Sequence, residues 1–190
     1  MSAVAASRYA DLAKRPIHVV QGEHAISDDP DIVLTTILGS CVAACMRDPV
    51  ARIGGMNHFL LPGGPKADGA DGESVRYGVH AMELLVNALL ARGARRERLE
   101  VKLFGGGRLV KGLTDVGASN ARFAEEFLAA EKLNHVGGSL RGDSGRRIQY
   151  WPVSGRARQV FLGDDRKAFE AETFLPVPKP APQTGALELF

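Results

Sequence analysis

One cysteine and one histidine in a short apolar stretch of this 190-residue chain could act together as a nucleophile and its base. Cys41 follows the small residues Gly39 and Ser40, and His58 lies in the next apolar run. A thiolate is a strong nucleophile, and an imidazole can take its proton and return it to a leaving group. The backbone amides of Ser40 and Cys41 are candidate donors to an oxyanion. On residue types alone, a purely structural pair in the core remains open.

A β-hairpin would bring the two side chains together. Two apolar runs flank the turn-forming pair Asp48-Pro49, a pattern that predicts antiparallel strands. A loop over residues 48–51 places Cys41 directly across from His58. Directly opposed side chains share one face of a sheet, with Cβ atoms roughly 4.5–5.5 Å apart, so a thiol could meet an imidazole. A bulge at Gly54-Gly55 would shift this register by one residue.

The same stretch, LGSCVAACMRDPVARIGGMNHFLLP, resembles the signature of the CheD-type chemoreceptor glutamine deamidases. That signature is close to T-x5-C followed by G-G-x-x-H-x-x-L-P. Weaker similarity continues through KLFGGG (102–107), DVGASN (115–120) and GDSGRR (142–147), so it spans most of residues 17–162. The residues that match the signature are Thr35, Cys41, Gly54, Gly55, His58, Leu61 and Pro62.

The resemblance implies a role for each of three residues. Cys41 would be the nucleophile, His58 the base, and Thr35 the residue that orients the imidazole; Thr36 is adjacent and could be confused with Thr35. The implied reaction converts glutamine to glutamate on the cytoplasmic helices of methyl-accepting chemotaxis receptors, through a thioester and without a cofactor. Receptor glutamate methyl esters could follow the same route. A CheC-type phosphatase is a further partner to consider.

Composition agrees with an intracellular enzyme domain. Hydrophobic residues make up 45% of the chain and charged residues 24%, which is ordinary for a globular protein. The net charge of +2 is too small to argue for nucleic-acid binding. No apolar run approaches a membrane span, and no signal core precedes Arg8. Cys41 and Cys45 lie too close on one strand to close a useful disulfide, which favours the reducing cytoplasm.

Periodicity predicts an α+β domain over residues 17–163, which the resemblance makes a cysteine deamidase domain. We expect mixed or antiparallel sheets in a layered sandwich flanked by two main helices (α/β/β/α-like), with the central hairpin carrying the cysteine and the histidine. Residues 1–16 would form a variable leader and 164–190 a Pro-rich tail. The expected strands are 17–26, 32–38, 99–104, 148–153 and 158–162, and the expected helices are 74–92 and 117–132.

The two helices should each bury an apolar stripe. The first ends at Gly93 and turns His80 toward solvent, and Asn134 caps the second. The inward residues are Val75, Val79, Met82, Leu85 or Val86, and Leu89 in the first helix, and Ala121, Ala124, Phe127 and Leu128 in the second.

Three glycine-rich or basic segments have two interpretations each. The run Gly105–Gly107 lacks the spacing of a phosphate loop, so close backbone packing near the site is favoured. The loop 63–72 is a solvated connection or a lid or docking edge. The basic cluster is a solvated loop or a docking site for an acidic receptor helix; its members are Arg92, Arg95, Arg96 and Arg98.

One rival chemistry and two rival function classes remain. A metal site from Cys41, Cys45 and His58 lacks a C-x2-C pair and a fourth ligand, and Cys45 is expected in the core. Nucleic-acid binding would use the basic and aromatic residues near 146–151, although alternation within a strand explains them more simply. A non-catalytic adaptor that binds receptors or a chemotaxis phosphatase is the third alternative to an amidohydrolase.

Overall fold

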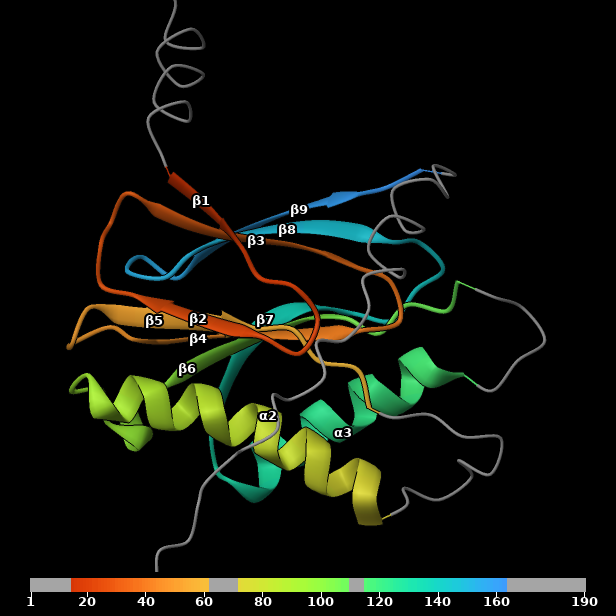
Figure 1. Cartoon of the computed structure of the whole chain (residues 1–190), viewed down its shortest axis with the longest axis horizontal. Coiled ribbons are helices and arrows are strands. Elements are labelled where there is room, and N and C mark those ends of the chain that lie inside the picture. Colours follow the sequence, from red (N-terminus) through yellow and green to blue (C-terminus); the bar gives the residue numbers. More distant parts are fainter. Residues whose placement is uncertain (1–14, 62–71, 110–114, 164–190) are drawn as a thin grey trace, which may run out of the picture.

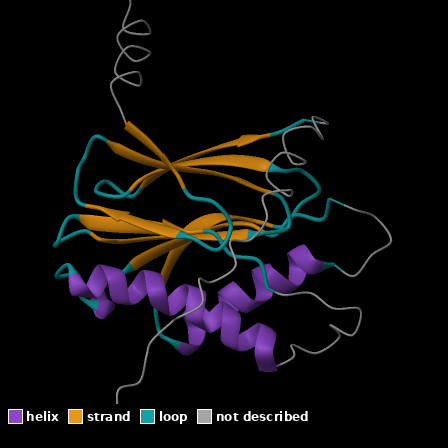
Figure 2. Cartoon of the chain, in the orientation of Figure 1, coloured by secondary structure: helices purple, strands orange, loops and turns teal. Residues whose placement is uncertain are grey.

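A computed structural model describes residues 15–61, 72–109 and 115–163, which form two stacked β-sheets and a layer of helices (Figures 1 and 2). The four-stranded sheet has the order β1-β3-β8-β9 and the five-stranded sheet the order β2-β5-β4-β6-β7. The strands are β1 Arg15–His18, β2 His24–Ser27, β3 Ile32–Leu38, β4 Val42–Asp48, β5 Ile53–Asn57, β6 Glu100–Gly105, β7 Asn134–Leu140, β8 Arg146–Trp151 and β9 Arg156–Phe161. The helices are α2 Gly72–Ala91, the short 3-10 helix η1 Arg96–Arg98, and α3 Val116–Ala130.

Both long helices cover the same sheet. Helix α2 contacts β2, β4 and β5, and α3 contacts β4, β6 and β7, all of which belong to the five-stranded sheet. Figure 2 shows the two helices together on one side of the stacked sheets. The expected α+β class, with layered mixed sheets and two main helices, is confirmed, but the layer order is sheet, sheet, helices rather than α/β/β/α. The five-stranded sheet is covered on both faces: the helices pack on one face and the four-stranded sheet packs on the other.

Strand β4 shows how the central sheet serves two cores. Val42, Ala44 and Met46 pack toward the helices, whereas Ala43 and Cys45 pack toward the four-stranded sheet. All five are fully buried, which is the pattern of a strand covered on both faces. Cys45 is therefore a core residue, as expected, and burial raises the pKa of its thiol well above the ordinary value.

Helix α2 confirms most of the expected stripe and corrects one position. Val79 is 38% exposed, and Gly78 takes the inward place instead. A Cβ at Gly78 would lie 2.6 Å from the side chains of Leu61 and Phe123, so the helix packs too closely there for a side chain. His80 is exposed and Gly93 follows the helix with φ +93°, both as expected. The fully buried stripe residues are Met82, Leu85, Val86 and Leu89.

The remaining elements match the predictions except at two places. The single strand expected over 17–26 is two strands in different sheets, because Gly22 turns the chain with φ +87° between β1 and β2. Asn134 begins the unexpected strand β7, which pairs parallel with β6, and does not cap α3. Strand β7 is the last in its sheet and five of its seven residues are exposed, so it lacks the apolar alternation that marks a half-buried strand. The expected inner face of α3 and the antiparallel β8–β9 hairpin are confirmed.

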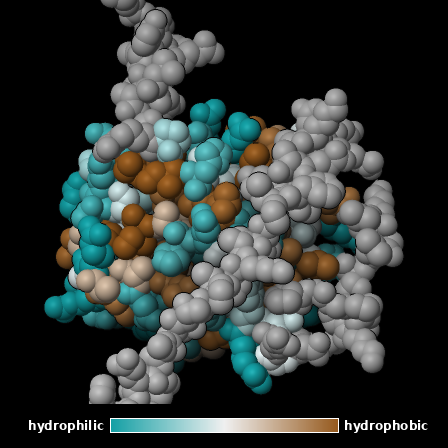
Figure 3. All heavy atoms as spheres, in the orientation of Figure 1, coloured by the Kyte–Doolittle hydropathy of each residue, from teal (hydrophilic) through white to brown (hydrophobic). Residues whose placement is uncertain are grey.

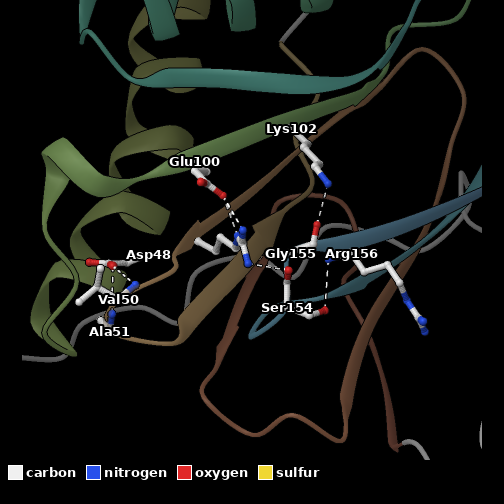
Figure 4. A network of polar contacts seen from close by, with 9 residues as sticks. Asp48, Val50, Ala51, Glu100, Lys102, Ser154, Gly155 and Arg156 are labelled. Carbon is white, nitrogen blue, oxygen red and sulfur yellow. Dashed lines mark hydrogen bonds and ion pairs between the residues drawn. The ribbon is translucent and has the colours of Figure 1, made fainter.

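Polar contacts tie the sheets together at the Asp48 end of β4 (Figure 4). Arg47 pairs with Glu100 at 2.8 Å and donates to the Ser154 carbonyl at 2.6 Å. Lys102 donates to the Gly155 carbonyl at 2.7 Å, as Figure 4 shows. Strands β4 and β6 of one sheet thus hold the β8–β9 turn of the other. The end of β4 that adjoins Cys41 carries different contacts, described below.

The described surface is mixed in character. On the face seen in Figure 3, hydrophobic residues form small patches separated by hydrophilic ones. None of the described helices combines the length and apolar character needed to cross a membrane. The expected leader (1–16), glycine-rich loop (63–72) and Pro-rich tail (164–190) fall almost wholly outside the described residues.

Candidate active site

The β4–β5 hairpin has a register two residues away from the one expected. Asp48 pairs with Ile53, so the connecting loop is 49–52 rather than 48–51. The Asp48 carboxylate explains the difference, because it accepts hydrogen bonds from the amides of Val50 at 2.9 Å and Ala51 at 3.0 Å and so stabilises the turn that begins after Asp48. Side chains alternate along a strand, so a shift of two residues leaves each on its expected face.

Cys41 and His58 flank this hairpin on the face toward the four-stranded sheet. Cys41 directly precedes β4 and His58 directly follows β5, and the bridge between Val42 and Phe59 joins the two segments with hydrogen bonds of 3.0 and 2.9 Å. In this register the two residues are diagonal rather than direct neighbours. Diagonal pairs have Cβ atoms at somewhat less than about 7–8 Å, within reach of a longer side chain. Cys41 is half-buried, whereas His58 is only 3% exposed.

Thr36 and Val19 hold the imidazole and determine which nitrogen carries its proton. The Thr36 hydroxyl donates to the Val19 carbonyl at 2.7 Å and lies 2.9 Å from His58 Nδ1. Its single proton is used on the carbonyl, so the hydroxyl accepts from Nδ1–H. Val19 O also lies 3.3 Å from Nδ1, and a carbonyl can only accept. The contacts therefore assign the proton to Nδ1 and leave a lone pair on Nε2.

The Nε2 side of the His58 ring is buried and makes no hydrogen bond with the described residues. Burial lowers the pKa of His58 to about 4, against a smaller opposing effect of the Val19 carbonyl. At neutral pH the ring is therefore uncharged, and its Nε2 lone pair is buried where an unpaired polar atom is unfavourable.

Thr35 lies on the other face of β3 from the imidazole. Its hydroxyl donates to the Ile148 carbonyl at 2.9 Å, within its own sheet. Strand β3 places Leu34, Thr36 and Leu38 toward the five-stranded sheet, because side chains alternate. The hydrogen bond to His58 that we expected from Thr35 thus comes from Thr36.

Three hydrogen-bond donors hold the backbone carbonyls of residues 39–41. Gly107 N donates to the Gly39 carbonyl at 2.8 Å, and Gly106 N to the Cys41 carbonyl at 2.7 Å. A Cβ at Gly105 would lie only 2.1 Å from the Cys41 carbonyl oxygen. The expected close packing of the triple glycine near the site is confirmed, and its reason is steric.

Asn120 supplies the third donor and was not singled out from the sequence. This fully buried residue of α3 donates from Nδ2 to the Ser40 carbonyl at 2.9 Å and accepts at Oδ1 from the Leu61 amide at 2.9 Å. It thus ties the turn before Cys41 to the segment after His58. The only signal in the sequence was its place at the end of the DVGASN similarity.

A second unexpected residue, Gln21, lies at the thiol itself. The Cys41 thiol donates to Gln21 Oε1 at 3.5 Å. Gln21 belongs to the turn between β1 and β2, where the chain passes from one sheet to the other (Figure 1). No sequence pattern links Gln21 with Cys41, because the two residues meet only through the stacking of the sheets.

Comparison with known proteins places the chain in a family. The family model described as CheD chemotactic sensory transduction matches residues 60–160. A protein of Acidiphilium cryptum (strain JF-5), named probable chemoreceptor glutamine deamidase CheD, is 61% identical over 182 residues, 95% of each chain. The chain belongs to the CheD family. CheD proteins with the same printed name from Caulobacter sp. (strain K31) and Rhizobium meliloti (strain 1021) are 55% and 54% identical, covering 92% and 90% of this chain and 92% and 94% of theirs.

The basic cluster of this CheD protein is largely engaged in ion pairs. Arg98 contacts Asp48 at 2.6 Å, Arg96 contacts Glu131 at 2.5 Å, and Arg92 contacts Asp28 at 3.0 Å. Burial would raise the pKa of the Asp48 carboxyl, but hydrogen bonds from Arg98 and three backbone amides hold it well below the usual range. These arginines therefore have structural partners that the docking interpretation did not foresee.

The structure bears on two of the alternatives, the metal site and the basic, aromatic stretch near 146–151. Arg146, Tyr150 and Trp151 are at most 6% exposed, and the Arg146 guanidinium donates to the Ser139 carbonyl at 2.6 Å. This CheD protein therefore turns most of its basic and aromatic residues on β8 inward. Within the described ranges, no three His, Cys, Asp or Glu side chains are grouped to hold a metal ion.

Proposed function

We propose that this protein hydrolyses the side-chain amide of glutamine residues on chemoreceptors, with Cys41 as the nucleophile and His58 as the base. One observation carries the proposal: a buried imidazole presents an unpartnered Nε2 on the same face as a half-buried thiol. An unsatisfied buried polar atom costs free energy, so its presence at a cysteine favours a functional site. The relatives are named as chemoreceptor glutamine deamidases, which suggests glutamine side chains of chemoreceptors as the substrate class.

The reaction would proceed in two halves. Nε2 of His58 takes the thiol proton while the sulfur attacks the carboxamide carbon, and the tetrahedral intermediate releases ammonia with the proton that His58 returns. This leaves a thioester between Cys41 and the substrate. A water molecule, deprotonated by the same nitrogen, then attacks the thioester, giving glutamate and restoring the thiol. The uncharged resting state of His58 suits the first step, and the disfavoured imidazolium returns its proton readily.

Thr36 and Asn120 would be positioning residues. Thr36 holds the Nδ1–H tautomer and so keeps the lone pair on Nε2. Asn120 and the two glycine amides hold the carbonyls of residues 39–41, which orients the backbone whose amides at Ser40 and Cys41 would face the oxyanion. Removing one such oxyanion donor typically costs about 3 kcal/mol of transition-state stabilisation.

Three finer expectations accompany the proposal. A receptor glutamate methyl ester would pass through the same thioester, because only the leaving group differs. A CheC-type phosphatase is the further partner that the family resemblance brings, and co-purification with such a phosphatase tests it. The substrate helices would place the reaction in the cytoplasm, and no cofactor enters any step.

The test compares three forms of the full chain on a purified receptor cytoplasmic fragment. Wild type should raise the fragment mass by about one dalton per glutamine converted and release an equal amount of ammonia. Cys41→Ala should do neither, whereas the matched control Cys45→Ala, altered only in the core, should retain activity. A fragment that gains mass equally with Cys41→Ala would overturn the proposal, as would no gain with wild type.

A further inference from the structure

Gln21 presents to the proposed nucleophile the same chemical group as the proposed substrate. The Cys41 thiol donates to the Gln21 carboxamide oxygen at 3.5 Å. We propose that Gln21 is an internal ligand of the active site, whose carboxamide occupies the place of the substrate carboxamide in the resting enzyme. A receptor glutamine must then displace it. The inference rests on the proposed function, since it takes Cys41 to be the site of glutamine hydrolysis.

The turn that carries Gln21 is built to present a side chain. Glu23 N donates to the Val20 carbonyl at 3.1 Å, which closes a four-residue turn. Gly22, at the third position, has φ +87°, the conformation that a type II turn requires there and that glycine adopts without strain. Gln21 occupies the second position and is exposed. Its side chain can therefore reorient without any change in the backbone.

The same turn is fastened to the proposed base. Gly22 N donates to the His58 carbonyl at 2.7 Å, and His58 N donates to the Glu23 carbonyl at 3.0 Å. Val19, just before the turn, contributes the carbonyl that contacts His58 Nδ1. The position of Gln21 relative to His58 is thus set by two backbone hydrogen bonds just after it and by the contact of the Val19 carbonyl with the imidazole just before it. A carboxamide on an anchored turn has a high effective concentration at the thiol.

The contact has a direct chemical consequence. A thiol that donates to a carbonyl oxygen is held in its protonated form, and the thiolate would lose that bond. In the place of the substrate carboxamide, the Gln21 side chain would also obstruct an electrophile that approaches the sulfur. Because the thiol is a weak donor, removal of the contact should change reactivity by roughly two- to fivefold.

The first experiment measures the contact without any receptor. Cys41 is alkylated with iodoacetamide and followed by peptide mass, with the buried Cys45 as an unreactive internal reference. Gln21→Met keeps the side-chain length but removes the carboxamide, and should speed labelling roughly two- to fivefold. Gln21→Glu should slow it, because the carboxylate repels the thiolate. Gln149→Met, the same change at a half-buried glutamine of β8, should leave the rate at the wild-type value.

Equal labelling of Gln21→Met and wild type would overturn the inference, as would acceleration by both Gln21 variants. Labelling should become faster with Gln21→Met and slower with Gln21→Glu. A general loosening of the turn would instead speed labelling in both variants. Circular dichroism of each variant establishes that the fold is retained.

The second experiment follows deamidation of the receptor fragment. An internal occupant lowers the fraction of competent sites, so Gln21→Met should lower KM roughly two- to fivefold and leave kcat unchanged. A fall in kcat with unchanged KM would overturn the inference, because Gln21 would then assist the reaction. If wild type deamidates nothing, the proposed function fails, and the alkylation rates still decide whether Gln21 occupies the thiol.

Discussion

Acidification should destabilise this protein through His58, and the size of the effect follows from the burial of the ring. The imidazole is 3% exposed and its pKa in the fold is about 4, against an ordinary value of 6.5. Between these values the unfolded chain binds a proton that the folded chain does not, so stability is present above pH 6.5 and is lost as the pH falls toward 4. At about 1.4 kcal/mol per pH unit, the loss approaches about 3 kcal/mol.

A loss of this size is measurable, because whole domains are stable by only about 5–15 kcal/mol. The free energy of unfolding in urea is determined at several pH values between 7.5 and about 4. The variant His58→Gln lacks the titrating group, so wild type should lose about 3 kcal/mol more than the variant over this range. His80→Gln, at an exposed position on α2, is the matched control and should follow wild type.

The reasoning is refuted if wild type and His58→Gln lose the same free energy on acidification. The imidazole would then be as easily protonated in the fold as outside it. Such a result would also mean that the ring gains charge just below neutral pH, so burial would no longer account for the uncharged resting state of the proposed first step.

Three further tests address the residues that hold the site. Thr36→Val should lower kcat about tenfold or more through loss of the bond to His58 Nδ1, whereas Thr35→Val should change it little; equal kcat values would contradict the assignment of Thr36. Asn120→Ala leaves the Ser40 carbonyl and the Leu61 amide without their partner, so urea unfolding should show a loss of about 3 kcal/mol. Gly105→Ala must displace the Cys41 carbonyl and adopt a left-handed conformation, and should cost about 2 kcal/mol or more with a matching fall in activity. An active, fully stable Gly105→Ala variant would contradict the close packing.

Most local elements could be predicted because their signals are local. The buried stripe of α2, the half-buried β6 and the β8–β9 hairpin each follow from a repeat within a few residues, and the structure confirms them. Strand β7 was not predicted, because it is largely exposed at the end of its sheet and so carries no apolar alternation. The packing of both helices on one face of the five-stranded sheet could not be predicted from the sequence either, because it depends on how the two sheets stack.

The chemistry of the site was already present in the chain order. Cys41, His58 and the glycines between them define a thiol and an imidazole on adjoining strands, and a register shift of two residues preserved their shared face. The choice between Thr35 and Thr36 needed the fold, because adjacent residues on a strand point to opposite faces. Gln21 and Asn120 join the site from distant segments, and only sheet stacking and helix packing bring them to the thiol and to the turn before it, respectively.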